Sequence, residues 1–155
     1  MATFTKFNSF VEAVAEKVHN LGSDTMMVLL TNTAPVAADT YVDTVSSPCI
    51  IGPSSSAVEV AAGFGYTKKG NSAAISSSAQ SGGLYKLVLA DPATWTASGG
   101  SIGPFRYVVL YNDTGGAAAT RPVIGFWDYA SSITLGVGET FTADMDPTTG
   151  VLTIQ

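Results

Sequence analysis

The feature of this chain that most restricts its fold is the repeated alternation of short apolar runs with turn-forming residues. From Thr25 onward the sequence contains roughly eight or nine strand-like runs, separated by turn signals at intervals of about ten residues. The clearest signals are Asp91-Pro92, Asn112–Gly116 and Asp146–Gly150, and the last of these is typical of a hairpin turn. Because a parallel sheet would need helical crossovers between strands, the spacing favours antiparallel sheets. We therefore expect a mainly β chain with an antiparallel β-sandwich or jelly-roll-like domain.

A segment near the N-terminus has helical periodicity instead. Its apolar residues recur at the spacing of one face of an α-helix, and they are Phe7, Phe10, Val11, Val14, Val18 and Leu21. The sequence thus predicts an amphipathic helix over residues 7–21, with Ser9 and Glu12 as a capping box. A helix this short needs an apolar surface to lie on, in its own domain or in a neighbouring molecule. Phe7, Phe10 and Val14 are therefore candidates for contact with a partner.

The length and composition fit one domain, residues 1–155, with a β-rich body over residues 25–155. The single cysteine, Cys49, permits no intramolecular disulfide, and its apolar surroundings predict that it is buried. No apolar run approaches the ~20 residues of a membrane-spanning helix and no secretory signal is apparent, so we expect no membrane partner. The net charge of −5 argues against nucleic acid as a partner, because phosphate binding needs a basic surface.

Residues that could carry catalysis or bind a metal are few. The chain has one histidine, His19, and one cysteine, which excludes a zinc site of the usual ligands. We expect His19 to close the helix, where a histidine favours the helix dipole. No serine lies in a nucleophile elbow and no phosphate-binding loop is present, so we expect a protein that is not an enzyme and needs no cofactor. Asp144 and Asp146 could bind calcium, or Asp146 could bond to the backbone of a turn, which we favour.

The chain is poor in charge. Charged residues make up 12% of it, against about 25% in a typical soluble domain, and the densest uncharged stretch is Trp95–Phe141. Apolar surface with so few charges is hard to keep in solution unless a partner covers it, which indicates a protein that works in an assembly. Arg106 lies among the aromatic residues of this stretch. It either pairs across the sheet, with Asp128 as the predicted mate, or contacts a partner subunit, so both residues are interface candidates.

Five segments of the sequence are distinctive as text. They read FNSFVEAVAEKVHNLGSD, LTNTAP, GFGYTKKG, LADPATWTASGGSIGPFRYVVLYND and RPVIGFWDYASSITLGVGETFTADMD. Together they cover nearly the whole chain, and they resemble small virion proteins of tailed bacteriophages. The resemblance implies a capsid cement or decoration protein, made in the host cytoplasm and bound to the capsid surface of the virion. Its partners would be the major capsid protein and further copies of itself in a homo-oligomer.

The alternative is a tail-fibre or tail-tip module that binds a host glycan or receptor. Trp95, Trp127 and Tyr129 could stack on sugar rings if they were exposed, but we expect them to pack in the core. Three stretches of small residues are further candidates for contact with the capsid, and they are 46–56, 72–83 and 115–120. The stretch 72–83 reads either as a loop or as a strand with shallow packing.

Overall fold

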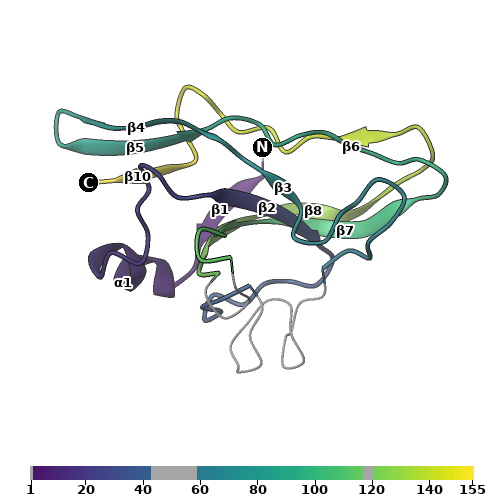
Figure 1. The fold of residues 1–155 in the computed structure, drawn as a ribbon, viewed down its shortest axis with the longest axis horizontal. Coiled ribbons are helices and arrows are strands. Elements are labelled where there is room, and N and C mark those ends of the chain that lie inside the picture. Colours follow the sequence, from purple (N-terminus) through teal and green to yellow (C-terminus); the bar gives the residue numbers. More distant parts are fainter. Residues whose placement is uncertain (1, 43–58, 117–120) are drawn as a thin grey trace.

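The structure is a computed structural model that describes residues 2–42, 59–116 and 121–155. Cys49, the stretch 46–56 and most of the stretch 115–120 lie outside the described residues. Within them the chain is mainly β, with antiparallel sheets and one short helix (Figure 1), which confirms the predicted fold class. In chain order the elements are β1 (Thr3–Lys6), α1 (Ser9–Ala15), β2 (Met26–Thr31), β3 (Asn71–Ser72), β4 (Ile75–Ser81), β5 (Leu84–Leu89), β6 (Trp95–Thr96), β7 (Ile102–Asn112), β8 (Val123–Leu135), β9 (Thr140–Phe141) and β10 (Leu152–Ile154).

The largest sheet has five strands in the order β1-β8-β7-β2-β3. Its centre is the long pair β7 and β8. The turn signal Asn112–Gly116 begins at the last residue of β7 and precedes β8 in the chain. β2 lies antiparallel to β7, with Met26 opposite Asn112 and Thr31 opposite Tyr107. β1 pairs with β8 along one edge of the sheet, and the short β3 pairs with β2 along the other.

Two smaller sheets lie over one face of the large sheet (Figure 1). They are a three-stranded sheet of order β10-β5-β4 and a two-stranded sheet of β6 and β9. The main core lies between these layers and draws side chains from all of them and from α1, including Phe10, Leu30, Leu87, Trp95 and Leu110. This layering is compatible with the expected sandwich.

The other face of the large sheet carries a second core. Its buried members are Phe7, Leu29, Val42, Val109, Tyr111 and Val123. Leu29 points to this side and Leu30 to the main core, as the alternation of side chains along a strand requires. Both faces of the central strand β2 are therefore covered, which explains why it is apolar at nearly every position.

The N-terminal helix is shorter than its periodicity predicts. α1 spans Ser9–Ala15 rather than residues 7–21. It begins late because Phe7 belongs to the second core, and the N–H of Phe7 donates to the Ile124 carbonyl oxygen (3.1 Å). It ends early because Lys17 adopts a left-handed backbone conformation, with φ 62°. Phe7, Phe10 and Leu21 of the apolar stripe therefore pack on the chain's own domain, while Val11 and Val18 remain exposed.

The predicted capping box is wrong. No side chain caps the N-terminus of α1, and the Ser9 hydroxyl instead donates to the Asp39 carbonyl oxygen (3.2 Å). His19 does not close the helix either, because it lies beyond the end of α1 and is buried. Both corrections have one cause, which is that the tertiary contacts of this segment outweigh its local helical pattern.

The turn signals predicted the positions of most strands, but they did not predict correctly which strands pair. β1 was not predicted, and the stretch 72–83 contains the strand β4. The segment Asp146–Gly150 turns as expected, with the Gly150 N–H donating to the Asp146 carbonyl oxygen (3.0 Å). The predicted hairpin across it is wrong, because β9 pairs with β6 while β10 pairs with β5.

Candidate functional site

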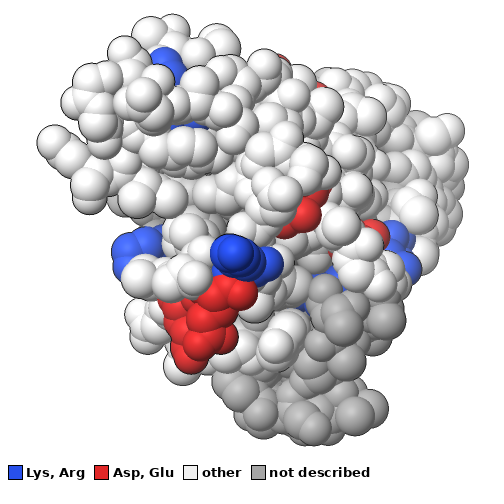
Figure 2. Space-filling model, turned by 60° about the vertical axis from the view of Figure 1, so that its left-hand side comes forward, with Lys and Arg blue, Asp and Glu red and all other residues white. Residues whose placement is uncertain are grey.

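A cleft opens at one end of the molecule, between the segment that follows α1 and the hairpin of β4 and β5. It encloses about 550 Å³ and is lined by Val14, Lys17, His19, Asn20, Leu21, Gly22, Ser78, Tyr85 and Ile154. The cleft exists because the hairpin extends beyond the large sheet and over α1 (Figure 1). Figure 2 shows a hollow below a lobe with few charged side chains, with acidic and basic side chains gathered beneath it.

Four exposed apolar side chains lie at the same end of the molecule. Val11, Val18, Leu84 and Ile154 are 55%, 47%, 39% and 38% exposed, respectively. They come from α1, from the segment after it, and from the strands β5 and β10. A single exposed apolar side chain is ordinary on a protein surface, but Val11, Val18 and Ile154 at the end of the molecule with the cleft form a surface that a partner could cover. Leu84 points to the opposite face of the hairpin from Tyr85, which lines the cleft.

Of the three helix residues predicted to contact a partner, which are Phe7, Phe10 and Val14, Val14 alone lines this cleft. Phe7 and Phe10 are buried in the chain's own two cores, so neither offers surface to a partner. The expectation that they form an interface is corrected accordingly, since the helix already lies on an apolar surface inside its own chain. The exposed members of the same stripe are Val11 and Val18.

Two strand residues of the cleft, Tyr85 on β5 and Ile154 on β10, were not predicted. Each lies on a strand whose alternation is that of an ordinary half-buried strand, so sequence pattern alone does not separate them from the core. The one signal was the polar, small-residue composition of the stretch 72–83. This composition predicted shallow packing for β4. Because the small side chains of β4 cover little of the neighbouring strand, the first residues of β5 are partly exposed to solvent.

Arg106 and Asp128 form the cross-strand ion pair that the sequence predicts. Arg106 Nε donates to Asp128 Oδ1 (2.7 Å) and a terminal guanidinium nitrogen donates to Asp128 Oδ2 (2.8 Å). The hydrogen bond from Arg106, followed by one from the Ala130 N–H, holds the pKa of the Asp128 carboxyl below its ordinary value. The guanidinium also lies 5.2 Å from the centre of the Tyr107 ring. Both charges are thus partnered inside the chain while remaining partly exposed on β7 and β8.

His19 belongs to a hydrogen-bonded cluster that joins the segment after α1 to the end of β7. The Asn112 side-chain nitrogen lies 3.3 Å from His19 Nδ1 and donates to Asp24 Oδ2 (2.6 Å). Burial is the strongest influence on His19 and lowers its pKa, while the Asp24 carboxylate and the backbone of Val123 act in the opposite direction. The neutral imidazole is therefore the form that the fold favours.

We expect the protein to lose stability as the pH falls from 7 toward 5, and His19→Gln to lose less over the same interval. The pKa of folded His19 lies below its unfolded value, so its contribution is complete above the unfolded pKa and disappears as the pH falls through the folded pKa. Each unit of difference corresponds to about 1.4 kcal/mol. Buried Asp39, whose pKa is raised, acts in the opposite sense and at lower pH. Urea denaturation at pH 5, 6 and 7 measures the free energy of unfolding of both proteins. The same dependence on pH in the wild type and in His19→Gln would contradict a contribution from His19.

Asp146 acts as the structural residue of a turn. Its Oδ1 accepts hydrogen bonds from the N–H groups of Thr148 (2.7 Å) and Thr149 (3.1 Å), and its Oδ2 accepts one from the Thr149 hydroxyl (2.6 Å). These bonds, with that from the Thr149 hydroxyl the largest, lower the pKa of Asp146. The turn interpretation is confirmed. Across the described ranges, no group of three or more His, Cys, Asp or Glu side chains is placed to hold a metal ion.

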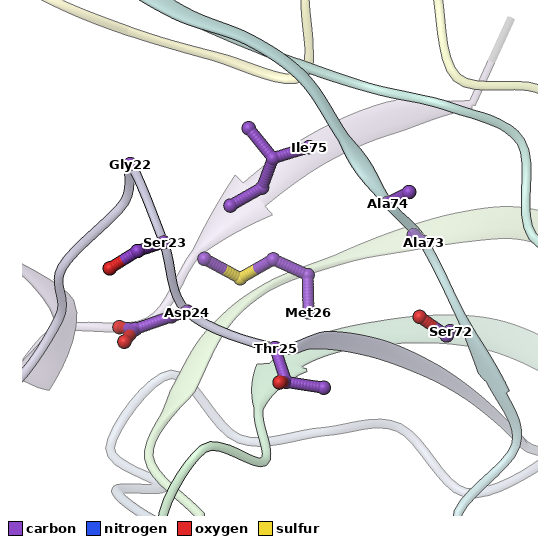
Figure 3. A pocket seen from close by; sticks show the side chains of 9 residues that line it. All are labelled: Gly22, Ser23, Asp24, Thr25, Met26, Ser72, Ala73, Ala74 and Ile75. Atoms are coloured by element: carbon purple, nitrogen blue, oxygen red, sulfur yellow. The ribbon is translucent and has the colours of Figure 1, made fainter.

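A second, smaller pocket of about 310 Å³ lies where two strands part. It is bounded by residues 22–26, which lead into β2, and residues 72–75, which lead from β3 into β4. Figure 3 shows the side chains of Met26 and Ile75 pointing toward one another across it. The carboxylate in its lining, Asp24, already accepts hydrogen bonds from the Asn20 N–H (2.6 Å) and from Asn112. The pocket therefore lies where two sheets separate, and its one carboxylate is already hydrogen-bonded within the chain.

The aromatic residues considered for sugar binding are not displayed together. Trp95 is buried, with its ring 6.3 Å from that of Tyr66 and 5.9 Å from that of Phe141. Trp127 is partly covered and packs against Phe4, while Tyr129 is exposed. Core packing is confirmed for Trp95, and it removes that ring from any exposed stacking surface.

Comparison with protein families, curated proteins and solved structures finds no match for this chain. None of the helices in the described residues has the length and apolar character needed to cross a membrane. The candidate site is a surface, and it consists of the apolar cleft together with the exposed residues Val11, Val18 and Ile154. We call it the cleft surface.

Proposed function

We propose that this chain is a non-enzymatic structural protein of a bacteriophage virion, a cement or decoration protein bound to the capsid surface. Its partners are the major capsid protein and further copies of itself. The observation that carries the proposal is the cleft surface, an apolar area at one end of a chain with few charges. The resemblance of its sequence segments to small virion proteins of tailed phages supplies the kind of assembly.

The physical basis of such a function is burial of apolar area and mass action. Covering exposed apolar surface stabilises a contact by about 25 cal/mol per Å². The lobe above the cleft carries few charges, so covering that side removes water from few ions. A protein that binds the assembled shell and not its separated subunits stabilises the shell in proportion to its occupancy. This function requires a surface that fits the shell and many bound copies of the protein, and it requires no reactive side chains.

We expect Val18→Glu to weaken binding of the purified protein to capsid shells prepared without it by tenfold or more. A carboxylate placed in a covered apolar contact loses its hydration without gaining a partner. Val137→Glu is the matched control, because Val137 is 69% exposed and precedes β9 in the chain. β9 pairs with β6, which lies at the end of the molecule away from α1 (Figure 1). Cosedimentation with shells, followed by quantitative gel analysis, measures both affinity and copy number.

The wild-type protein should saturate shells at a fixed ratio to the major capsid protein and in hundreds of copies, and saturated shells should resist heat better than bare ones. Equal binding by the two glutamate variants would show that the cleft surface is not the contact. A handful of copies per virion would overturn the cement assignment and favour the tail module that binds a glycan or receptor.

A further inference from the structure

We infer that the free edge of β4 pairs with the same edge of a second copy of this chain, so that two three-stranded sheets join into one. β4 is the outer strand of the order β10-β5-β4, and in the described part of the chain no strand pairs with its outer side. An edge strand presents unpaired N–H and C=O groups that favour pairing with another strand. The inference concerns contact between copies and does not depend on the proposed binding to a capsid.

The other free edges differ from that of β4. β3, β6 and β9 have two residues each and β10 has three, which is too short to template a partner strand. β8 extends beyond β1 as far as Leu135, but its edge is interrupted at Ala130, which has φ 70°. β1 has four residues and includes Lys6, whose charge disfavours pairing. β4 has seven residues, none of them charged and none of them proline, and its one irregularity lies between Ile75 and Ser77 at its start.

The hairpin geometry indicates which backbone groups face outward. Gly82 and Gly83 both have positive φ and form a two-residue loop, so the flanking pair Ser81 and Leu84 is expected to be hydrogen-bonded. Antiparallel pairs alternate between bonded and non-bonded, which directs the N–H and C=O groups of Ser78 and Gln80 away from β5. These groups lie at the middle and far end of the strand, beyond its irregularity.

We infer a second copy as the occupant because a twofold axis brings two identical uncharged edges together. The chain carries a net charge of −5, and the repulsion between two copies is weakest where the facing surfaces are uncharged. The sequence of β4, ISSSAQS, is uncharged throughout, and all its residues except Ile75 and Ser78 are exposed. An antiparallel pair about a twofold axis therefore brings no like charges together and no large side chains into collision. Because a strand pair buries less than the ~1,600 Å² of a standard interface, we expect a weak dimer.

The test compares oligomeric state across variants by sedimentation velocity over a range of concentrations. The wild-type protein should shift from monomer to dimer as its concentration rises. Ser77→Lys/Ser81→Lys places like charges on both paired edges and should raise the dimer dissociation constant at least tenfold. Ser98→Lys/Ser101→Lys is the matched control, with the same change in net charge at exposed positions preceding β7, and it should dimerise as the wild type does.

A charge-complementation experiment distinguishes this contact from any other. Mixing Ser77→Lys/Ser81→Lys with Ser77→Glu/Ser81→Glu should restore a dimer that contains one chain of each kind, since opposite charges then meet across the paired strands. A wild-type protein that stays monomeric up to about 1 mM, a dimer that the β4 lysines leave intact, or a mixture that stays monomeric would each overturn the inference. Binding to shells is measured separately, so failure here leaves the proposed function to its own test.

Discussion

Gly70→Ala should lower the free energy of unfolding by at least about 3 kcal/mol. Gly70 has φ +71°, a conformation that costs an alanine about 1 kcal/mol or more. A Cβ atom there would also overlap the Val28 carbonyl oxygen and lie 2.8 Å from the Leu29 Cα. Both atoms belong to the backbone of β2, which is held by β7 and cannot move without breaking the central sheet.

The matched control is Gly138→Ala. Gly138 has φ +87° but nothing within 4 Å of an added Cβ, so alanine meets the conformational cost alone and should lose about 1 kcal/mol. Urea denaturation followed by tryptophan fluorescence measures both variants. Equal losses would show that contact between the loop at Gly70 and β2 does not limit stability.

Glu59→Ala should lower the free energy of unfolding by about 3 kcal/mol. Buried Glu59 accepts hydrogen bonds from the Tyr66 hydroxyl (2.8 Å) and the Lys69 N–H (2.5 Å), and the Tyr66 oxygen accepts one from the Leu30 N–H (3.1 Å). Burial, and then the nearby carboxylate, raise the pKa of Tyr66, so its hydroxyl keeps the proton that it donates. Alanine would leave the buried Tyr66 hydroxyl and the partly buried Lys69 N–H without this acceptor, and a buried donor left unpaired costs about 1–3 kcal/mol.

Glu59→Gln separates hydrogen bonding from charge. The glutamine carbonyl oxygen can still accept from Tyr66 and Lys69, and the charge removed is paired with Lys68, whose side chain is 50% exposed, at 3.8 Å. We expect a loss of about 1 kcal/mol or less, because partly exposed ion pairs contribute little. Thermal and urea denaturation measure the free energy of unfolding of the two variants. A glutamine variant as unstable as the alanine variant would show that the charge of Glu59, and not its hydrogen bonds, stabilises the fold.

Local pattern predicted those parts of the fold in which local and tertiary preferences agree. Met26–Thr31 is apolar on both faces because it is a central strand, and Asp146 closes its turn with its own side chain. The predicted partnership of Arg106 and Asp128 also holds, because two long β-runs around a turn signal most simply form adjacent strands. Each of these predictions depends on residues near in sequence or on one pair of neighbouring strands.

The failed predictions concern which side chains of the N-terminal segment the rest of the chain buries. The apolar stripe from Phe7 to Leu21 is helical in period, yet its first residue enters the second core and its helix ends at Ala15. Val14 reaches the cleft surface and Phe10 does not, although both belong to the same stripe. Burial depends on what the rest of the chain places against a side chain, and periodicity carries no information about that.

The sequence by itself determined that this chain forms many short antiparallel strands, with few charges and with its turns in identifiable places. Turn residues and strand alternation act through the backbone over a few positions, so they can be read locally. The tertiary structure alone decided that β9 and β10 join different sheets, that the β4–β5 hairpin projects over α1, and that β4 ends its sheet with an unprotected edge. Strand partners and free edges are set by contacts between residues far apart in the chain, where many arrangements satisfy the same local pattern.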